Sequence, residues 1–286
     1  MTAQLEPWAR VVGYLIVVGV CLEYAHRIYW FISKWAGRAP LSVFYKSFVI
    51  SLAANLPLLI ACGVTFSFCV FVDKESLETL GLRFDLKPGT YVAGGATIAF
   101  ISVALIFLIG YYSGWIRVYS SRISGNFHKS LPTVCGGITE FATASIFEEL
   151  IMRGYVFSIL YSRLGPSHAV IGSAAIFSLF HLVKHTRLPL LFTINAFFFG
   201  ILAAQSRLAT GALWMPIGLH IGWNFAASSV FGLPCAGRIY DGGLITCTVD
   251  GPKHITGGYY SPDAGLLGTV GIVFAASALV VLTPFV

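Results

Sequence analysis

The stretch IFEELIMRGY, residues 146–155, places two glutamates and an arginine inside an otherwise apolar run. The whole chain avoids charge: of its 286 residues, 57% are hydrophobic and only 10% are charged. A soluble domain has roughly 25% charged residues, so a lipid bilayer is the expected surrounding of this chain. A charge at the centre of a membrane helix costs about 2.5–3.5 kcal/mol on insertion-based scales. The charged group at 148–153 is therefore expected to face a polar interior.

Apolar segments on both sides of this stretch predict the membrane helices. A spanning helix needs about 20 apolar residues, and the segments that meet or approach this length are about 10–32, 46–72, 91–112, 134–161, 167–184, 189–206, 211–231 and 264–285. The connectors between them are too short for a further domain. The sequence thus predicts an all-α, polytopic membrane protein with about eight transmembrane helices around an intramembrane cavity, in a single domain over residues 1–286.

The residues after the first apolar segment and the distribution of Lys and Arg over the loops predict how the chain is inserted in the membrane. The first apolar segment is followed by EYAHR instead of a small-residue cleavage site, which favours a membrane helix over a signal peptide. The loops after the first, third, fifth and seventh segments hold the larger share of the 18 Lys and Arg residues. This favours the cytoplasm for these loops and the outside for both termini. The scattered cations indicate lipid headgroups as a partner and argue against nucleic acid.

Two connectors are long and polar. Residues 73–90 are long enough for a surface helix, and residues 232–263 are rich in Gly, Pro and polar side chains. The second connector is interpreted mainly as solvated, with a part in substrate selection as the alternative. Cys235 and Cys247 lie in it and could form a disulfide if the loop is extracytoplasmic.

Helix geometry separates the roles of the two glutamates. At 100° per residue, Arg153 lies one turn from Glu149 and about 40° from it around the axis. The same arithmetic places Arg153 about 140° from Glu148. Arg153 can therefore neutralise Glu149, while Glu148 has no obvious partner on its own helix. A carboxylate in a desolvated cavity suits general-base chemistry; the alternative is an ion-pair cluster that only holds helices together.

Two more polar pairs lie on later segments. FSLFH places Phe177 and His181 at positions i and i+4, and HIGWN places His220 and Asn224 at the same spacing. With Glu148, three separate helices then supply a base, proton carriers and an amide donor, which hydrolysis of a carbonyl substrate requires. Antiparallel helices would bring these groups to the same end of the bundle. Phe177 is more simply explained by packing.

The motifs EELIMR, FSLFH and HIGWN, in this order on three membrane helices, resemble those of the CPBP family. This family contains the CAAX proteases and bacteriocin-processing enzymes, among them the type II CAAX prenyl endopeptidase. The resemblance covers residues from about 134 to 231, and the amino acids in the motifs are closer to those of bacterial members. It implies an intramembrane glutamic protease in a bacterial cytoplasmic membrane. Its substrate would be a peptide or protein, with a lipidated C-terminus as one option.

The resemblance also implies roles for the residues. In that family the first glutamate of the pair and the histidine of the second motif activate the attacking water. The histidine and asparagine of the third motif stabilise the tetrahedral oxyanion. Carried over to this chain, Glu148 and His181 become the water-activating pair, and His220 and Asn224 become the oxyanion donors. Glu149 and Arg153 become the supporting pair, in agreement with the helix geometry.

The resemblance leaves metal dependence open. No metal is then required, although Glu148, His181 and His220 could alternatively form a zinc site with one open position. The asparagine of the third motif is a natural oxyanion donor and an unusual zinc ligand, which favours the mechanism without metal.

Other functions can be weighed against this one. The sequence has no H-E-x-x-H, no G-x-S-x-G and no Gly-x-Gly-Asp motif, which argues against zincin-type, serine and aspartyl chemistry. Buried charges also mark proton relays in transporters, but no inverted repeat or matched pair of broken helices is visible. A membrane protein that uses the same cavity only to bind a peptide, such as an immunity protein, stays open at this point.

Overall fold

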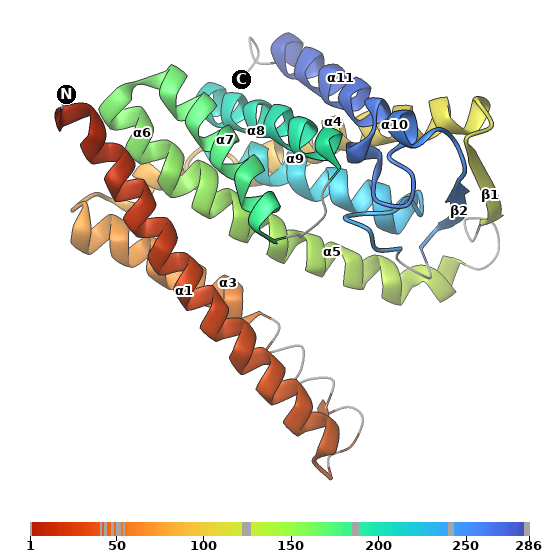
Figure 1. Cartoon of the computed structure of the whole chain (residues 1–286), viewed down its shortest axis with the longest axis horizontal. Helices are drawn as coiled ribbons and strands as arrows, with labels where there is room; N and C mark the ends of the chain where they lie inside the picture. Colours follow the sequence, from red (N-terminus) through yellow and green to blue (C-terminus); the bar gives the residue numbers. More distant parts are fainter. Residues whose placement is uncertain are drawn as a thin grey trace.

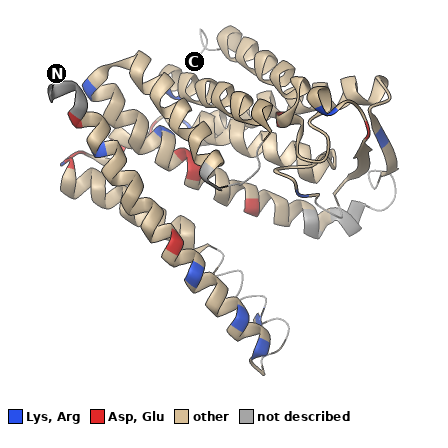
Figure 2. Ribbon diagram, in the orientation of Figure 1, with Lys and Arg blue, Asp and Glu red and all other residues tan. Residues whose placement is uncertain are grey.

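Helices dominate the computed structural model, which describes residues 2–40, 42, 45, 46, 49, 53, 55–121, 127–184, 189–239 and 243–282 (Figure 1). Most of the ribbon carries no charged residue (Figure 2). Three helices are long and apolar enough to cross a membrane: Glu6–Arg38, Pro88–Tyr112 and Leu190–Thr210. Shorter apolar helices accompany them at Leu56–Val72, Pro166–Leu182 and Leu266–Leu282. The predicted all-α, polytopic membrane fold is confirmed.

The predicted apolar segments coincide with helices wherever the structure describes them. In chain order the helices are α1 (Thr2–Arg38), α3 (Leu56–Ser67), α4 (Pro88–Tyr112), α5 (Phe127–Glu149), α6 (Phe157–Leu164), α7 (Pro166–Lys184), α8 (Leu190–Thr210), α9 (Trp214–Phe225) and α11 (Leu266–Leu282). Most of the predicted second segment before residue 55 lies outside the described residues.

Three helices change into a π-helix without a break. The π segments are η1 (Phe68–Val72) after α3, η3 (Leu150–Val156) between α5 and α6, and η4 (Ala226–Val230) after α9. Such segments are rare and are often found at functional sites. Two of them begin at the candidate motifs: η3 directly follows Glu149, and η4 begins two residues after Asn224. The uniform 100° spacing assumed from the sequence therefore ends at Glu149.

Glycines bring α9 into close contact with α4, and this contact orients the third motif. α9 packs against α4, α5 and α8. A Cβ atom on Gly222 would lie 2.6 Å from Cα of Ala96, and one on Gly218 would lie 2.8 Å from Cα of Val92. Only glycine permits these backbones to approach so closely, as in other small-residue helix contacts in membranes. His220 lies between the two glycines in sequence and is buried.

The connector after α9 folds onto the bundle. It contains β2 (Ile245–Val249), α10 (Lys253–Thr256) and the 3-10 helix η5 (Pro262–Ala264). β2 pairs antiparallel with β1 (Ile116–Ser121) from the connector after α4. The strands were not predicted. Leu233, Thr256 and Ser261 are buried, so the prediction of a mainly solvated connector is wrong.

Two further details of the connectors, which the sequence left open, are visible in the structure. Cys235 and Cys247 are free thiols and form no disulfide with each other. Within residues 73–90, the only helical turn before α4 is the short 3-10 helix η2 (Leu77–Leu80).

Candidate active site

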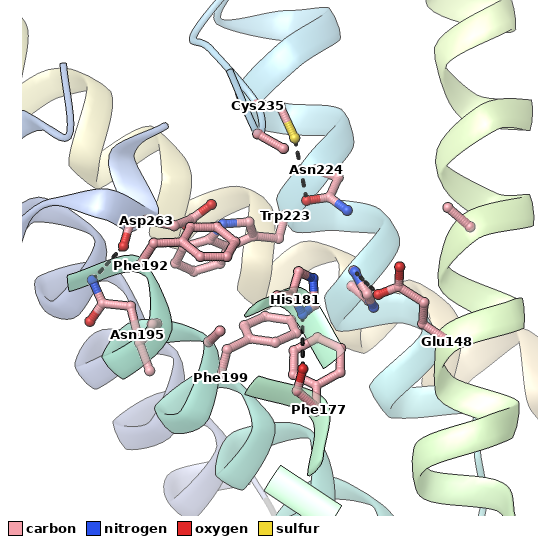
Figure 3. A pocket seen from close by; sticks show the side chains of 15 residues that line it. Glu148, Phe177, His181, Phe192, Asn195, Phe199, Trp223, Asn224, Cys235 and Asp263 are labelled. Carbon is pink, nitrogen blue, oxygen red and sulfur yellow. Dashed lines mark hydrogen bonds and ion pairs between the residues drawn. The ribbon is translucent and has the colours of Figure 1, made fainter. Parts of the chain in front are cut away.

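The four predicted site residues line one cavity of about 160 Å³ between α5, α7, α8, α9 and the connector that precedes α11 (Figure 3). Glu148 comes from the last turn of α5, His181 from the end of α7, and His220 and Asn224 from α9. The side chains are thus brought together from three helices that are far apart in sequence.

Glu149 holds the imidazole of His220. Its Oε1 atom lies 2.9 Å from Nδ1 of His220 and accepts a hydrogen bond of 3.1 Å from Nη1 of Arg153. Glu149 and Arg153 are both fully buried. Arg153 also donates to the carbonyl of Gly200 in α8 and stacks over the ring of Phe177 in α7, with 4.3 Å to its centroid. The predicted Glu149–Arg153 pair is present, and it joins α5, α7, α8 and α9.

Glu148 has a different environment. Its Oε2 atom lies 3.9 Å from Nε2 of His220, and its side chain lines the cavity. Because Nδ1 of His220 is bonded to Glu149, the opposite ring nitrogen is the one directed toward Glu148. The two glutamates therefore contact the two nitrogens of one imidazole.

His181 is oriented by its own helix. Its Nδ1 atom lies 2.9 Å from the carbonyl oxygen of Phe177. A carbonyl can only accept a hydrogen bond, so Nδ1 carries the proton and Nε2 of the neutral ring has a free lone pair. The ring of Phe177 packs edge-on against His181 at 4.7 Å and against His220 at 6.1 Å. Phe177 thus packs between the two histidines, as expected.

Asn224 is half-buried at the connector side of the cavity. The thiol of Cys235 donates to its Oδ1 atom over 3.9 Å. This contact uses the amide oxygen and leaves the Nδ2 group as a donor for other partners.

The cavity has a second polar group that was not predicted from the sequence. Asp263 of η5 accepts a hydrogen bond of 2.8 Å from the indole of Trp223. Asn195 of α8 donates to the backbone carbonyls of Asp263 and Gly265 at 2.7 and 3.0 Å, and it accepts from Thr269 of α11 at 2.8 Å. Asn195 could have been noticed as an amide inside an apolar run. Asp263 could not, because it lies in a connector.

Within the part of the chain that the structure describes, no three His, Cys, Asp or Glu side chains are arranged as metal ligands. Glu148, His181 and His220 line the same cavity without converging on one point in this arrangement. The zinc alternative therefore requires these side chains to move.

Comparison with known proteins identifies the segment that carries the site. Residues 131–226 match the family model described as type II CAAX prenyl endopeptidase Rce1-like. This segment, about a third of the chain, is thus similar to the CAAX protease family. The match runs from α5 to the first residue of η4 and includes all three motifs. No curated protein and no solved structure matches the chain.

The family match indicates the general activity. Type II CAAX prenyl endopeptidases are hydrolases that act on peptide bonds, and the match of residues 131–226 supports the same general activity in a membrane for this chain. The matched segment contains Glu148, Glu149, His181 and His220, and Asn224 lies near its end. The bacterial source and membrane stay predictions.

Proposed function

We propose that this chain hydrolyses a peptide bond with a water molecule activated by Glu148 and His181, and that His220 and Asn224 stabilise the oxyanion. The observation that carries the proposal is the shared cavity: the four side chains line it together, from three helices. Its substrate is a peptide or protein segment that reaches the cavity within the membrane, with a lipidated C-terminus as the form that the family description suggests.

The first step uses Glu148 as the base. Nε2 of His181 accepts one hydrogen bond from the water, because Nδ1 is already bonded to the Phe177 carbonyl. Glu148 takes the second proton of the water as its oxygen attacks the carbonyl carbon of the substrate. The proton then passes from Glu148 to the amide nitrogen, the C–N bond breaks, and a carboxylic acid and an amine leave. One glutamate thus acts as general base and then as general acid.

The second component is stabilisation of the negative oxygen. Glu148, Glu149 and Arg153 together carry one net negative charge when ionised, and a protonated His220 would bring the group to zero. In this form Nδ1 donates to Glu149 and Nε2 can donate to the oxyanion. The free Nδ2 group of Asn224 is the second donor, since its oxygen already accepts from Cys235. Two preorganised donors of this kind are the usual arrangement for acyl-transfer intermediates.

A zinc-dependent protease is the second candidate. The hydrogen bond between Glu149 and His220 favours it to a degree, since zinc-binding histidines commonly donate their other nitrogen to a carboxylate. Zinc would act as a Lewis acid at Glu148, His181 and His220. Against it stands the lack of convergence of these side chains among the described residues.

The test is the purified protein in detergent or liposomes with a farnesylated, fluorescently quenched CAAX peptide. Glu148→Gln keeps the size of the side chain but removes the base, so cleavage should fall by at least about 10²-fold. Glu78→Gln, at an exposed position of η2, is the matched control and should cleave normally. Near-normal cleavage by folded Glu148→Gln would refute the assignment of the base.

A further inference from the structure

Asp263 is a carboxylate of the cavity that the proposed reaction does not use. It lines the same cavity as Glu148, and in the view of Figure 3 the two lie on opposite sides of it. Its side chain accepts from the indole of Trp223 at 2.8 Å and pairs with the hydroxyl of Ser261 at 2.6 Å. An asparagine could accept the same indole hydrogen bond without the cost of a partly buried charge. The charge itself therefore requires an explanation.

No Lys or Arg compensates Asp263 in the part of the chain that the structure describes, and the basic groups that share its cavity are His181 and His220. No described Lys or Arg lines the cavity, and none forms an ion pair with Asp263. Burial raises the pKa of the Asp263 carboxyl, which precedes the apolar helix α11; the hydrogen bonds from Ser261 and Trp223 and the nearby His181 and His220 act in the opposite direction. A cation placed in the cavity would supply the missing compensation.

Aromatic rings line the cavity beside Asp263. They belong to Phe192 and Phe199 of α8 and Trp223 of α9. Phe199 packs against Trp223 with 5.7 Å between ring centroids, and Phe192 packs against His181 with 5.6 Å. The faces of such rings attract ammonium and guanidinium groups, with the strongest effect for Trp and in desolvated sites. A carboxylate next to several aromatic faces is thus a favourable environment for a cation.

We propose that Asp263, with Phe192, Phe199 and Trp223, forms a subsite for a lysine or arginine side chain of the peptide substrate near the scissile bond. The inference rests on the proposed function, since it assigns the other side of the same cavity. The volume is sufficient: about 160 Å³ is available, and an apolar cavity of about 150 Å³ can bind benzene. Asn224 and Glu148 would act on the peptide bond while Asp263 holds the basic side chain.

Binding of a lysine side-chain mimic tests the subsite without any cleavage. n-Butylammonium should raise the melting temperature of the purified protein in a saturable way, whereas the neutral n-butanol should not. Asp263→Asn should abolish the n-butylammonium effect. This variant is expected to fold, because Asn195 holds the backbone carbonyls and not the carboxylate of Asp263. Asp250→Asn, at an exposed position after β2, is the matched control and should retain the effect.

Cleavage of a peptide series tests the consequence for specificity. In farnesylated CAAX peptides, Lys is compared with the uncharged Met at each of the three residues on either side of the scissile bond. At one position the wild type should prefer Lys by roughly ten- to a hundredfold in kcat/KM, the worth of a hydrogen bond to a charged group. Asp263→Asn should cleave the Lys and Met peptides with about equal kcat/KM.

The outcomes distinguish the two proposals. Cleavage by the wild type without any preference for Lys, together with equal effects of n-butylammonium on wild type and Asp263→Asn, would overturn the subsite and leave the hydrolysis in place. Asp263-dependent binding of n-butylammonium by a protein that cleaves none of the peptides would support the subsite and count against the proposed reaction. If Asp263→Asn does not fold, the Lys and Met comparison on the wild type still decides.

Discussion

Oε1 of Glu149 lies 2.9 Å from Nδ1 of His220, although the two residues are 71 positions apart in the chain. The contact joins Glu149 of the first motif to His220 of the third motif. Helix geometry had paired Glu149 only with Arg153. Glu149 thus serves both a buried ion pair and a histidine of the cavity. Its substitution is expected to affect both folding and chemistry.

Glu149→Gln is expected to lower activity by roughly 10- to 100-fold, the usual effect of removing the partner that orients a functional histidine. The glutamine oxygen can still accept from Nδ1 of His220, but it no longer favours a charged imidazole. The measurement is kcat and KM on the folded fraction after size-exclusion chromatography. A variant with wild-type kcat would show that Glu149 contributes only to stability.

Arg153→Ala is expected to destabilise the fold strongly. It leaves Glu149 as a buried charge without its cation, and breaking such a pair costs about 3–5 kcal/mol. The matched control is Arg83→Ala, which removes the exposed Arg83–Asp85 pair of 2.8 Å in the connector before α4. Exposed pairs are worth about 0–1 kcal/mol. Equal melting temperatures for the two variants would contradict the structural role of the buried pair.

Asn224→Ala is expected to slow turnover with little change in substrate binding. Loss of one oxyanion donor costs about 2.7–4 kcal/mol, or 10²–10³ in rate. The thiol of Cys235 would lose its acceptor, which is a minor cost at 3.9 Å. The measurement is single-turnover cleavage together with the Kd of a non-hydrolysable peptide. An increase in Kd that accounts for the whole loss would assign Asn224 to binding instead.

Metal removal separates the water mechanism from the zinc mechanism. With Glu148 as base and no metal, a chelator should leave turnover unchanged, and elemental analysis should find no stoichiometric metal. Under the zinc alternative, His181→Ala and His220→Ala would both lose bound zinc. Stoichiometric zinc whose removal stops cleavage, and whose return restores it, would decide for the metal site.

Gly222→Ala is expected to lower activity without contacting the cavity. The added Cβ would lie 2.6 Å from Cα of Ala96, so α9 must shift away from α4 and carry His220 with it. A displacement of about 1 Å can cost 10²-fold in rate. Gly136→Ala in α5 is the matched control, since its added Cβ has no atom within 4 Å. Full activity of Gly222→Ala would show that the helix contact tolerates the shift.

Much of the fold follows from the sequence because the bilayer limits the choices. Apolar length alone places the helices, since a chain in lipid has to satisfy its backbone hydrogen bonds within each helix. The spacing of four residues between Glu149 and Arg153 predicts their ion pair, and the pair forms although Arg153 lies in the π segment η3. The strands β1 and β2 could not be predicted in this way, since their pairing depends on two connectors that are far apart in sequence.

The residues of the candidate site could also be predicted only in part. Polar side chains inside apolar runs point to Glu148, His181, His220 and Asn224, and all four line the cavity. The contact between Glu149 and His220 depends on how α5 and α9 are rotated against each other, which no single segment specifies. Asp263 lacks any local signal, since an aspartate in a polar connector is expected to be solvated.

The run from α5 to α6 consists of two helices with separate orientations on one continuous backbone. A π segment contains one residue more than an α-helix of similar extent, so η3 turns everything after it by about 100°. α5 before it packs against α9, whereas α6 after it packs against α1 and α7. Deletion of one residue within Leu150–Val156 would therefore rotate α6 about the helix axis relative to α5. Glu148 and Glu149 would keep their places, while α6 would present a different side to α1.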